Sequence, residues 1–172
     1  MNITGKIYLC IILCSFTAWS QQTAFQDSLL EHFAGDWILQ GTIAGKETTH
    51  DIHVAWILDH EYLQFQEISR EKKPTGAAEY EAIVYIGWDQ LLSQYACLWL
   101  DNTGGGGLTG QAIGHAKRSG DEIAFLFHGS DGSNFHTIFA YDRGSNSWRW
   151  LMDGEENGKL APFARVTLTK KK

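Results

Sequence analysis

The stretch from Tyr80 to Asn102 is YEAIVYIGWDQLLSQYACLWLDN, the densest run of aromatic and aliphatic residues in the chain. A five-residue turn at 89–93 would divide it into the two strands of a β-hairpin, with Trp88 opposite Gln94. Because side chains alternate between the two faces of a strand, this pairing sorts the hairpin into two faces. The aromatic–polar face would hold Glu81, Ile83, Tyr85, Tyr95, Cys97, Trp99 and Asp101, and the aliphatic face Ala82, Val84, Ile86, Ala96, Leu98 and Leu100.

Neither face of this hairpin is the polar surface of a half-solvated sheet, so both need cover. We expect the aromatic–polar face to line an interior and the aliphatic face to form an outer wall. A short amphipathic helix at 25–33, with Phe25, Leu29, Leu30 and Phe33 in one apolar stripe, would cover part of that wall, and a second subunit is the alternative cover. A register slip of one residue would exchange the faces.

From Asp36 onward the chain alternates short apolar strands with Gly-, Pro- and Asn-rich turns. Even spacing with short turns predicts an all-β fold, a single antiparallel up-and-down barrel of about ten strands with a short N-terminal helix. A β-sandwich is the alternative architecture. The sequence has no internal repeat and no sign of a second domain. Strands are expected near 36–43, 49–57, 60–70, 79–88, 93–102, 107–118, 121–128, 134–142, 147–153 and 162–170.

Residues 1–20 have the pattern of a secretory signal peptide, which leaves 21–172 as the barrel domain. Lys6 precedes an apolar run at 7–18, and Ala18-Trp19-Ser20 is a small-x-small cleavage site before Gln21. The run is short for a membrane span, although a retained anchor is the alternative. We therefore expect the mature protein to be exported, to the periplasm or the medium, with no membrane attachment after cleavage.

The net charge limits the classes of binding partner, and the cysteine content limits the possible disulfides. Without Lys6 the chain has 13 Lys and Arg against 20 Asp and Glu, a formal net charge of −7. That balance argues against nucleic acid and anionic membrane surfaces. Cleavage also removes Cys10 and Cys14, and the remaining Cys97 cannot form an internal disulfide. Its place in a strand suits a buried apolar residue.

Gly35-Asp36-Trp37 resembles the G-x-W signature of lipocalin-like (calycin) barrels. In those folds the tryptophan closes one barrel end beneath an arginine from the last strand, a role the resemblance gives to Trp37 and Arg165 as a cation–π pair. With Trp56-Ile57-Leu58, Gly87-Trp88-Asp89 and Trp99-Leu100-Asp101, the chain from about 29 to 169 is similar to a family of uncharacterised, often exported bacterial domains. The resemblance implies a calycin-like barrel and no established activity. Gly41 follows Trp37 at a spacing unlike that of haem-binding nitrobindin barrels.

Two motifs that could signal a cofactor are better explained by the fold. Residues 105–110, GGGLTG, match G-x-G-x-x-G, but a strand rather than a helix follows, so we expect a loop at the barrel mouth. His128 and His136 flank a turn, opposite a face that holds Ile123, Phe125 and Phe139 and makes a better core. We therefore expect these histidines on the outside or at the rim, and we predict no metal and no cofactor.

Carboxylates are the candidate reactive groups. With the preceding turn centred on Lys72 to Pro74, Glu67 would lie opposite Glu81, and Glu81 opposite Asp101. Three acids on neighbouring strands can raise each other's pKa, bind a cation or carry out acid–base chemistry. A solvated barrel rim also displays such acids. No catalytic residue can be named from the sequence.

Three functions remain open. The first is an exported barrel that binds a small apolar or amphipathic molecule, since such pockets are mostly aromatic with a few polar anchors. The second is a carboxylate-based isomerase or hydrolase. The third is a non-catalytic interaction domain, with a homodimer formed through the aliphatic sheet face. The expected ligand-binding residues are Trp56, Tyr85, Tyr95 and Trp99 as walls, with Glu81 and Asp101 as polar anchors.

Overall fold

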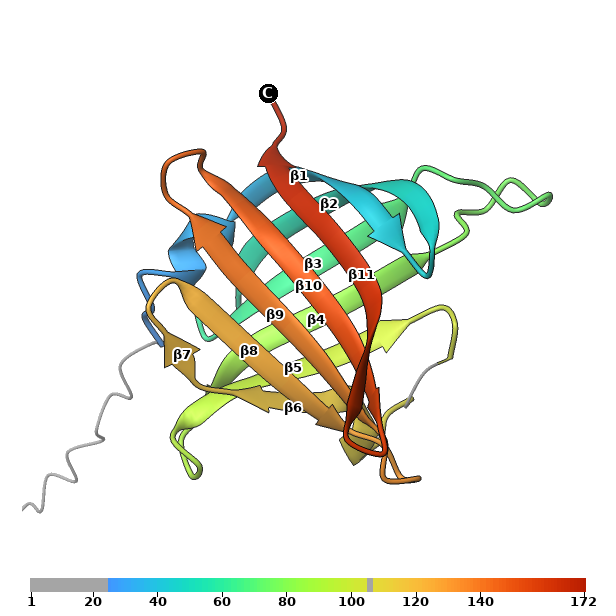
Figure 1. Ribbon diagram of the computed structural model, residues 1–172. Helices are drawn as coiled ribbons and strands as arrows, with labels where there is room; N and C mark the ends of the chain where they lie inside the picture. Colours follow the sequence, from blue (N-terminus) through green and yellow to red (C-terminus); the bar gives the residue numbers. More distant parts are fainter. Residues whose placement is uncertain (1–24, 105–106) are drawn as a thin grey trace, which may run out of the picture.

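The computed structural model describes residues 25–104 and 107–172, in which eleven strands form one antiparallel sheet that closes on itself (Figure 1). Strands β6 and β7 both pair with β8 and share one position, so the ring is a ten-stranded up-and-down barrel. The fold class predicted from the sequence is confirmed. The strands are β1 Gly35–Ile43, β2 Lys46–Ile57, β3 Tyr62–Ser69, β4 Glu81–Asp89, β5 Gln94–Asp101, β6 Ile113–Ala116, β7 Arg118–Ser119, β8 Glu122–His128, β9 Asn134–Asp142, β10 Ser147–Glu156 and β11 Lys159–Lys170.

Strand β1 pairs with β11, which brings the two ends of the described chain together. This ladder is tight at Gly41, whose φ is +144°. A Cβ there would lie 2.3 Å from the Arg165 carbonyl oxygen and 2.9 Å from Val166 Cα. Glycine is therefore required for the approach of the two strands.

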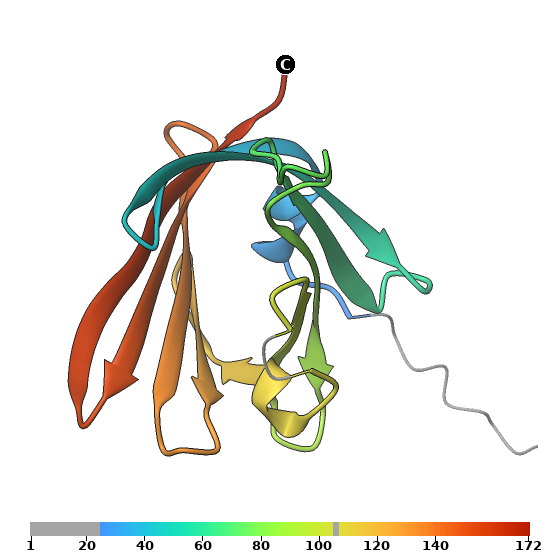
Figure 2. The same cartoon turned by 90° about the vertical axis from the view of Figure 1, so that its right-hand side faces the viewer.

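One end of the barrel is closed by aromatic packing. The short 3-10 helix η1, Leu30–Phe33, lies within the ring of strands in Figure 2. The Phe33 ring stacks on Trp148 with centroids 3.6 Å apart, and the Trp37 indole donates a hydrogen bond to the Phe33 carbonyl at 2.6 Å. All three side chains are fully buried.

The predicted position of the N-terminal helix is wrong. The expected stripe is real, because Leu29, Leu30 and Phe33 are fully buried, but they are buried in the barrel core and not on the outer wall. The helical part is four residues long, too short to cover a sheet face. It fits the barrel end, where three large apolar side chains can enter the core together.

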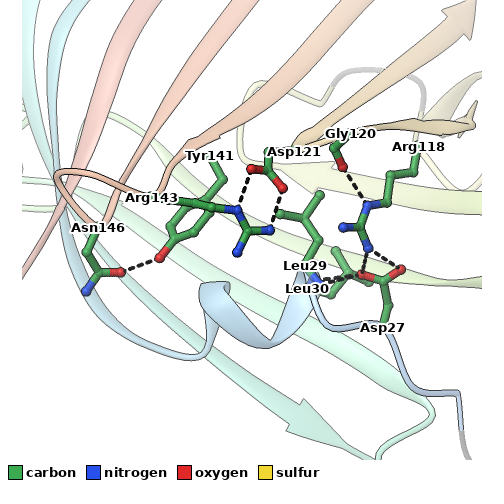
Figure 3. A network of polar contacts seen from close by, with 9 residues as sticks. All are labelled: Asp27, Leu29, Leu30, Arg118, Gly120, Asp121, Tyr141, Arg143 and Asn146. Carbon is green, nitrogen blue, oxygen red and sulfur yellow. Dashed lines mark hydrogen bonds and ion pairs between the residues drawn. The ribbon is translucent and has the colours of Figure 1, made fainter.

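Asp27 anchors to the barrel the plug formed by Leu29, Leu30 and Phe33 at the closed end (Figure 3). Its carboxylate accepts hydrogen bonds from the backbone amides of Leu29 and Leu30 at 2.8 and 3.0 Å. It also accepts a hydrogen bond from the Tyr95 hydroxyl at 2.5 Å and forms an ion pair with the Arg118 guanidinium at 3.2 Å. Burial raises the pKa of the Asp27 carboxyl, but the hydrogen bonds and Arg118 outweigh this, so its pKa lies below the ordinary value.

The cation over Trp37 is Lys170, and the predicted Arg165 is wrong. The β1–β11 register places Lys170 opposite Trp37 and Arg165 opposite Thr42. The Lys170 ammonium lies 4.3 Å from the Trp37 ring centroid and donates to the Ala34 carbonyl. The Arg165 guanidinium instead bonds to Asp153 on β10. A cation–π contact therefore closes this end, but the residue that makes it is five positions later in the last strand.

The central hairpin folds with a register one residue away from the predicted one. Trp88 pairs with Tyr95 and Asp89 with Gln94, because the turn has four residues and not five. On β5 the predicted interior residues are correct, but on β4 the faces are exchanged. Ala82, Val84 and Ile86 are buried, whereas Glu81, Ile83 and Tyr85 lie on the outer surface.

The β8–β9 hairpin has the predicted faces. Phe125, Thr137 and Phe139 are buried on the inner side. His128 is exposed and His136 is partly exposed, where its ring bonds to Glu155 at 2.7 Å. Both histidines lie outside the core, as expected.

Parts of the sequence-based predictions lie outside the described residues. These parts are the signal peptide, residues 1–20, and Gly105 and Gly106 of the glycine-rich motif. Within the described residues, neither η1 nor η2, Gly110–Ala112, is long or apolar enough to cross a membrane.

Candidate functional site: an amphipathic cavity in the open end

The end of the barrel opposite Trp37 contains a cavity of about 600 Å³. One wall is apolar and comes mainly from β8, β9, β10 and β11. The facing wall is polar and comes from β2, β3, β5 and the loop before β4. Its principal lining residues are Ile43, Phe127, Phe135, Thr137, Met152 and Phe163 on the apolar side, and Thr48, His50, Glu67, Ser69, Glu71, Tyr80, Trp99 and Asp101 on the polar side.

A hydrogen-bonded chain of four side chains crosses the polar wall. His50 Nδ1 lies 2.5 Å from Glu67 Oε1, and both side chains are almost completely buried. His50 Nε2 lies 2.8 Å from Thr48 Oγ1, and that hydroxyl donates to Glu71 Oε2 at 2.9 Å. The chain therefore links two carboxylates through one imidazole and one hydroxyl.

The proton positions in this chain follow from its donors. The Thr48 hydroxyl has one proton, which it gives to Glu71, so it must accept a hydrogen bond from His50 Nε2–H. The other nitrogen, Nδ1, faces Glu67. Either a protonated His50 therefore donates to the Glu67 carboxylate, or a neutral His50 accepts the proton of a Glu67 carboxylic acid. In both cases the two nitrogens of His50 are engaged. The ring has no free lone pair with which to act as a general base.

Glu71 is held ionised at the end of this chain. Burial raises the pKa of its carboxyl, but hydrogen bonds from the Thr48 hydroxyl and the Thr49 amide, with the nearby His50, lower the pKa below the ordinary value. The polar wall therefore carries a fixed negative charge at neutral pH.

Tyr80 and Trp99 extend the polar wall toward Asp101. The Trp99 indole donates to the Tyr80 hydroxyl at 3.1 Å, and that hydroxyl lies 3.4 Å from Asp101 Oδ2. Burial, followed by the negative charges of Glu67 and Asp101, raises the pKa of Tyr80 well above its ordinary value. Tyr80 is thus a neutral hydrogen-bonding group in this cavity.

The apolar wall contains an unsatisfied polar atom. Thr137 lines the cavity and is 1% exposed, and its hydroxyl oxygen has no hydrogen-bond partner among the described residues. The buried Trp150 indole N–H is likewise unpaired among the described residues, and the centroid of its ring lies 5.4 Å from that of the Trp99 ring. An unpaired buried hydroxyl is unfavourable unless a water or a ligand satisfies it.

Two of the six predicted ligand-binding residues, Trp99 and Asp101, line this cavity. The other four lie elsewhere. Tyr95 is buried at the closed end with Asp27, and Trp56 lies there too, in contact with His60 and Phe25. Tyr85 and Glu81 are on the outer face, because the β4 register differs by one residue from the predicted one.

The predicted row of three acids forms only in part. Glu67 and Asp101 both lie opposite Ala82 and line the cavity, whereas Glu81 is exposed outside. Within the described residues, no group of three His, Cys, Asp or Glu side chains is arranged to hold a metal ion.

The sequence analysis missed His50, Tyr80 and Thr48 as site residues. Strand alternation could have located His50, because it shares a face with Ile52 and Val54, both of which are buried. No comparable pattern marks Tyr80, which lies in a loop outside the regular strands.

No protein-family model matches the chain, and a search of the curated proteins found no match either.

Proposed function

We propose that this protein binds a small amphipathic molecule inside the open end of its barrel. The supporting observation is the cavity of about 600 Å³ between an aromatic wall and a polar wall. Binding pockets for small molecules commonly measure roughly 300–1,000 Å³ and combine apolar walls with a few polar groups. Both features occur here, at the end of a barrel whose other end is sealed.

We also propose that the barrel is of the lipocalin-like (calycin) type. The G-x-W of Gly35 and Trp37 opens β1, and Trp37 is buried at the closed end beneath a cation from the last strand. The strand order and the position of the cavity support the same assignment. In such a barrel the ligand enters through the end opposite the tryptophan.

Binding can be tested with N-phenyl-1-naphthylamine, a neutral apolar dye that fluoresces strongly when it leaves water. We expect saturable binding of one dye per chain. Trp99→Ala should weaken binding by about 1–3 kcal/mol, because apolar contact area is lost, which is roughly 5- to 150-fold in Kd.

Trp88→Ala is the matched control, because Trp88 lies in the same hairpin but stacks on Phe25 outside the cavity. It should leave the Kd unchanged. Circular dichroism melts of both variants separate lost binding from lost folding. Absence of saturable dye binding by the folded wild-type chain would contradict the proposal, and equal effects of the two substitutions would place the site elsewhere.

We further propose that the protein acts outside the cytoplasm, after removal of residues 1–20. The support is Lys6, the short apolar run at 7–18 and the Ala18-x-Ser20 site. The full chain is expressed in cells that can secrete it, and the intact mass of the exported protein is measured. The mass should be that of a protein that begins at Gln21. A mass that retains residues 1–20 would contradict cleavage.

A further inference from the structure

We infer that the ligand is an organic cation, an amine with an apolar body, whose ammonium group lies against the polar wall of the cavity. This inference rests on the proposed function and adds the charge of the ligand. It draws on the balance of charges around the cavity, on the groups left free to accept hydrogen bonds, and on the unsatisfied hydroxyl of Thr137.

Acids outnumber bases around the cavity. Glu67, Glu71 and Asp101 belong to the polar wall, and Glu47 and Glu79 lie at the exposed rim. The basic lining residues are His50, which faces Glu67, and Lys46, which is exposed at the rim. Even with His50 protonated, the wall keeps an excess of negative charge. In a cleft partly shielded from water, that excess attracts a cation and repels an anion.

The wall also has acceptors that protein groups do not use up. Among the described residues, the hydrogen-bond partner of the Glu67 carboxyl group is His50 alone, through Oε1, so Oε2 can accept a hydrogen bond whichever of the two residues holds the shared proton. Asp101 Oδ2 has one long contact, the 3.4 Å hydrogen bond from Tyr80. An ammonium carries three donors and no acceptor, so it complements oxygens of this kind. Trp99 lines the same wall, and the face of an indole ring attracts a cation that comes close to it.

Thr137 gives an independent indication that a ligand occupies the cavity. Its hydroxyl is buried, lies on the apolar side and has no partner among the described residues. A second polar atom on the ligand, such as a hydroxyl, ether or carbonyl oxygen, would pair with it. The expected ligand therefore has an ammonium at one end, an apolar middle that contacts Phe127 and Phe135, and one further polar atom.

An anionic ligand fits this cavity poorly. The carboxylate of a fatty acid would be buried beside Glu71 and Asp101, with like charges close together in a region of low dielectric constant, and the His50–Glu67 pair would add no net positive charge to offset them. Lys46 could reach such a group only at the rim, since it is exposed at the start of β2. A neutral amphipathic molecule would leave the acids without a counter-charge.

The test uses the full chain and three compounds with one carbon skeleton: 4-phenylbutylamine, 4-phenylbutan-1-ol and 4-phenylbutyrate. Each competes with bound N-phenyl-1-naphthylamine at neutral pH and low salt. We expect the amine to displace the dye at a concentration at least about tenfold lower than the butyrate, with the alcohol between them. The difference should shrink in high salt, but only partly, because the acids are shielded from solvent.

Variants assign the selectivity to the polar wall. Asp101→Asn and Glu71→Gln should each reduce the preference for the amine over the alcohol by about three- to tenfold, with little change in affinity for the alcohol. Glu81→Gln is the matched control, because it removes one charge from the neighbouring strand on the outer face. It should leave the preference unchanged.

The outcomes separate three claims: that the ligand is a cation, that the polar wall selects it, and that the cavity binds a small molecule at all. Equal displacement by all three compounds, or best displacement by the butyrate, would overturn the cation and leave the cavity as a binding site. Selectivity unchanged by Asp101→Asn and Glu71→Gln would overturn its assignment to this wall. Failure of the wild-type chain to bind the dye or any of the three compounds would overturn the proposed function as well.

Discussion

The two ends of the barrel are built in opposite ways. At the closed end, Phe33 stacks on Trp148 and the Trp37 indole has its hydrogen bond, while Asp27 ties the plug to the wall. At the open end there is a cavity, and the Thr137 hydroxyl lacks a partner among the described residues. The closed end therefore has the packing that stabilises the fold. The buried Trp148 indole N–H at the closed end is also unpaired among the described residues, so the two ends differ in packing: the open end leaves a volume that side chains do not fill, as binding sites commonly do.

The largest expected effect is at the closed end. Trp37→Ala should lower the free energy of unfolding by about 3–5 kcal/mol, because a fully buried indole is lost from a packed core. Phe135→Ala, which truncates a half-buried side chain in the cavity wall, should cost less, about 1–2 kcal/mol. Urea unfolding followed by circular dichroism measures both. Equal losses would remove the contrast between the two ends.

Asp27→Asn tests the anchor of the plug. We expect a loss of about 1–3 kcal/mol at pH 7, because a mostly buried carboxylate with several donors becomes an amide. Since the folded-state pKa of Asp27 is depressed, its contribution is complete above the unfolded pKa of about 4 and is lost as the pH falls through the lower folded value.

The stability difference between the wild type and Asp27→Asn should therefore narrow between roughly pH 5 and pH 2. Urea unfolding at several pH values measures it. Glu122→Gln is the control, because Glu122 is exposed at the start of β8, so its replacement should leave the pH dependence of stability unchanged. A difference that stays constant over this range would show that the Asp27 charge does not stabilise the plug.

Thr137→Val should have the smallest effect and the opposite sign. It replaces an unpaired buried hydroxyl with a methyl group of similar volume, so the unliganded protein should gain about 1 kcal/mol. Thermal melts without ligand measure the gain. Thr167→Val on the outer face of β11 controls for β propensity, because Thr167 is exposed. Destabilisation by Thr137→Val alone would mean that the hydroxyl already has a partner, such as a bound water.

Most strand positions could be predicted because strands alternate and most turns carry Gly, Pro or Asn, and both signals are local. The turns at 58–61 and 90–93 carry none of these residues, and the strand expected at 107–118 is in part the 3-10 helix η2, with strands only at Ile113–Ala116 and Arg118–Ser119. Register is not local. On β4, Ile83 and Tyr85 looked as suitable for an interior as Val84 and Ile86, so the pattern could not correct a turn that is one residue shorter than expected. Tyr85 and Glu81 were misplaced for this reason, whereas Trp99 and Asp101 on β5 were placed on the correct face.

The closing cation and the plug have a related explanation. Both Arg165 and Lys170 lie in β11, and only the β1–β11 ladder decides which of them reaches Trp37. The apolar stripe of Leu29, Leu30 and Phe33 indicated that these residues are buried, but it could not distinguish burial in the barrel core from burial against the outer wall. Its destination depends on which end of the barrel is left open, which is a property of the assembled ring.

The β1–β11 ladder also has a consequence for how the chain folds. The other ladders of the described chain join strands that are near neighbours in sequence, so they can form as successive hairpins. The β1–β11 ladder joins the first strand to the last, so closing the intervening chain into a loop costs more conformational entropy here than in any of those hairpins. We therefore expect an open, curved meander to form first, with its two terminal edges exposed to other chains. Loss of the last strand would leave β1 as a permanent free edge, so a shortened chain should aggregate rather than fold.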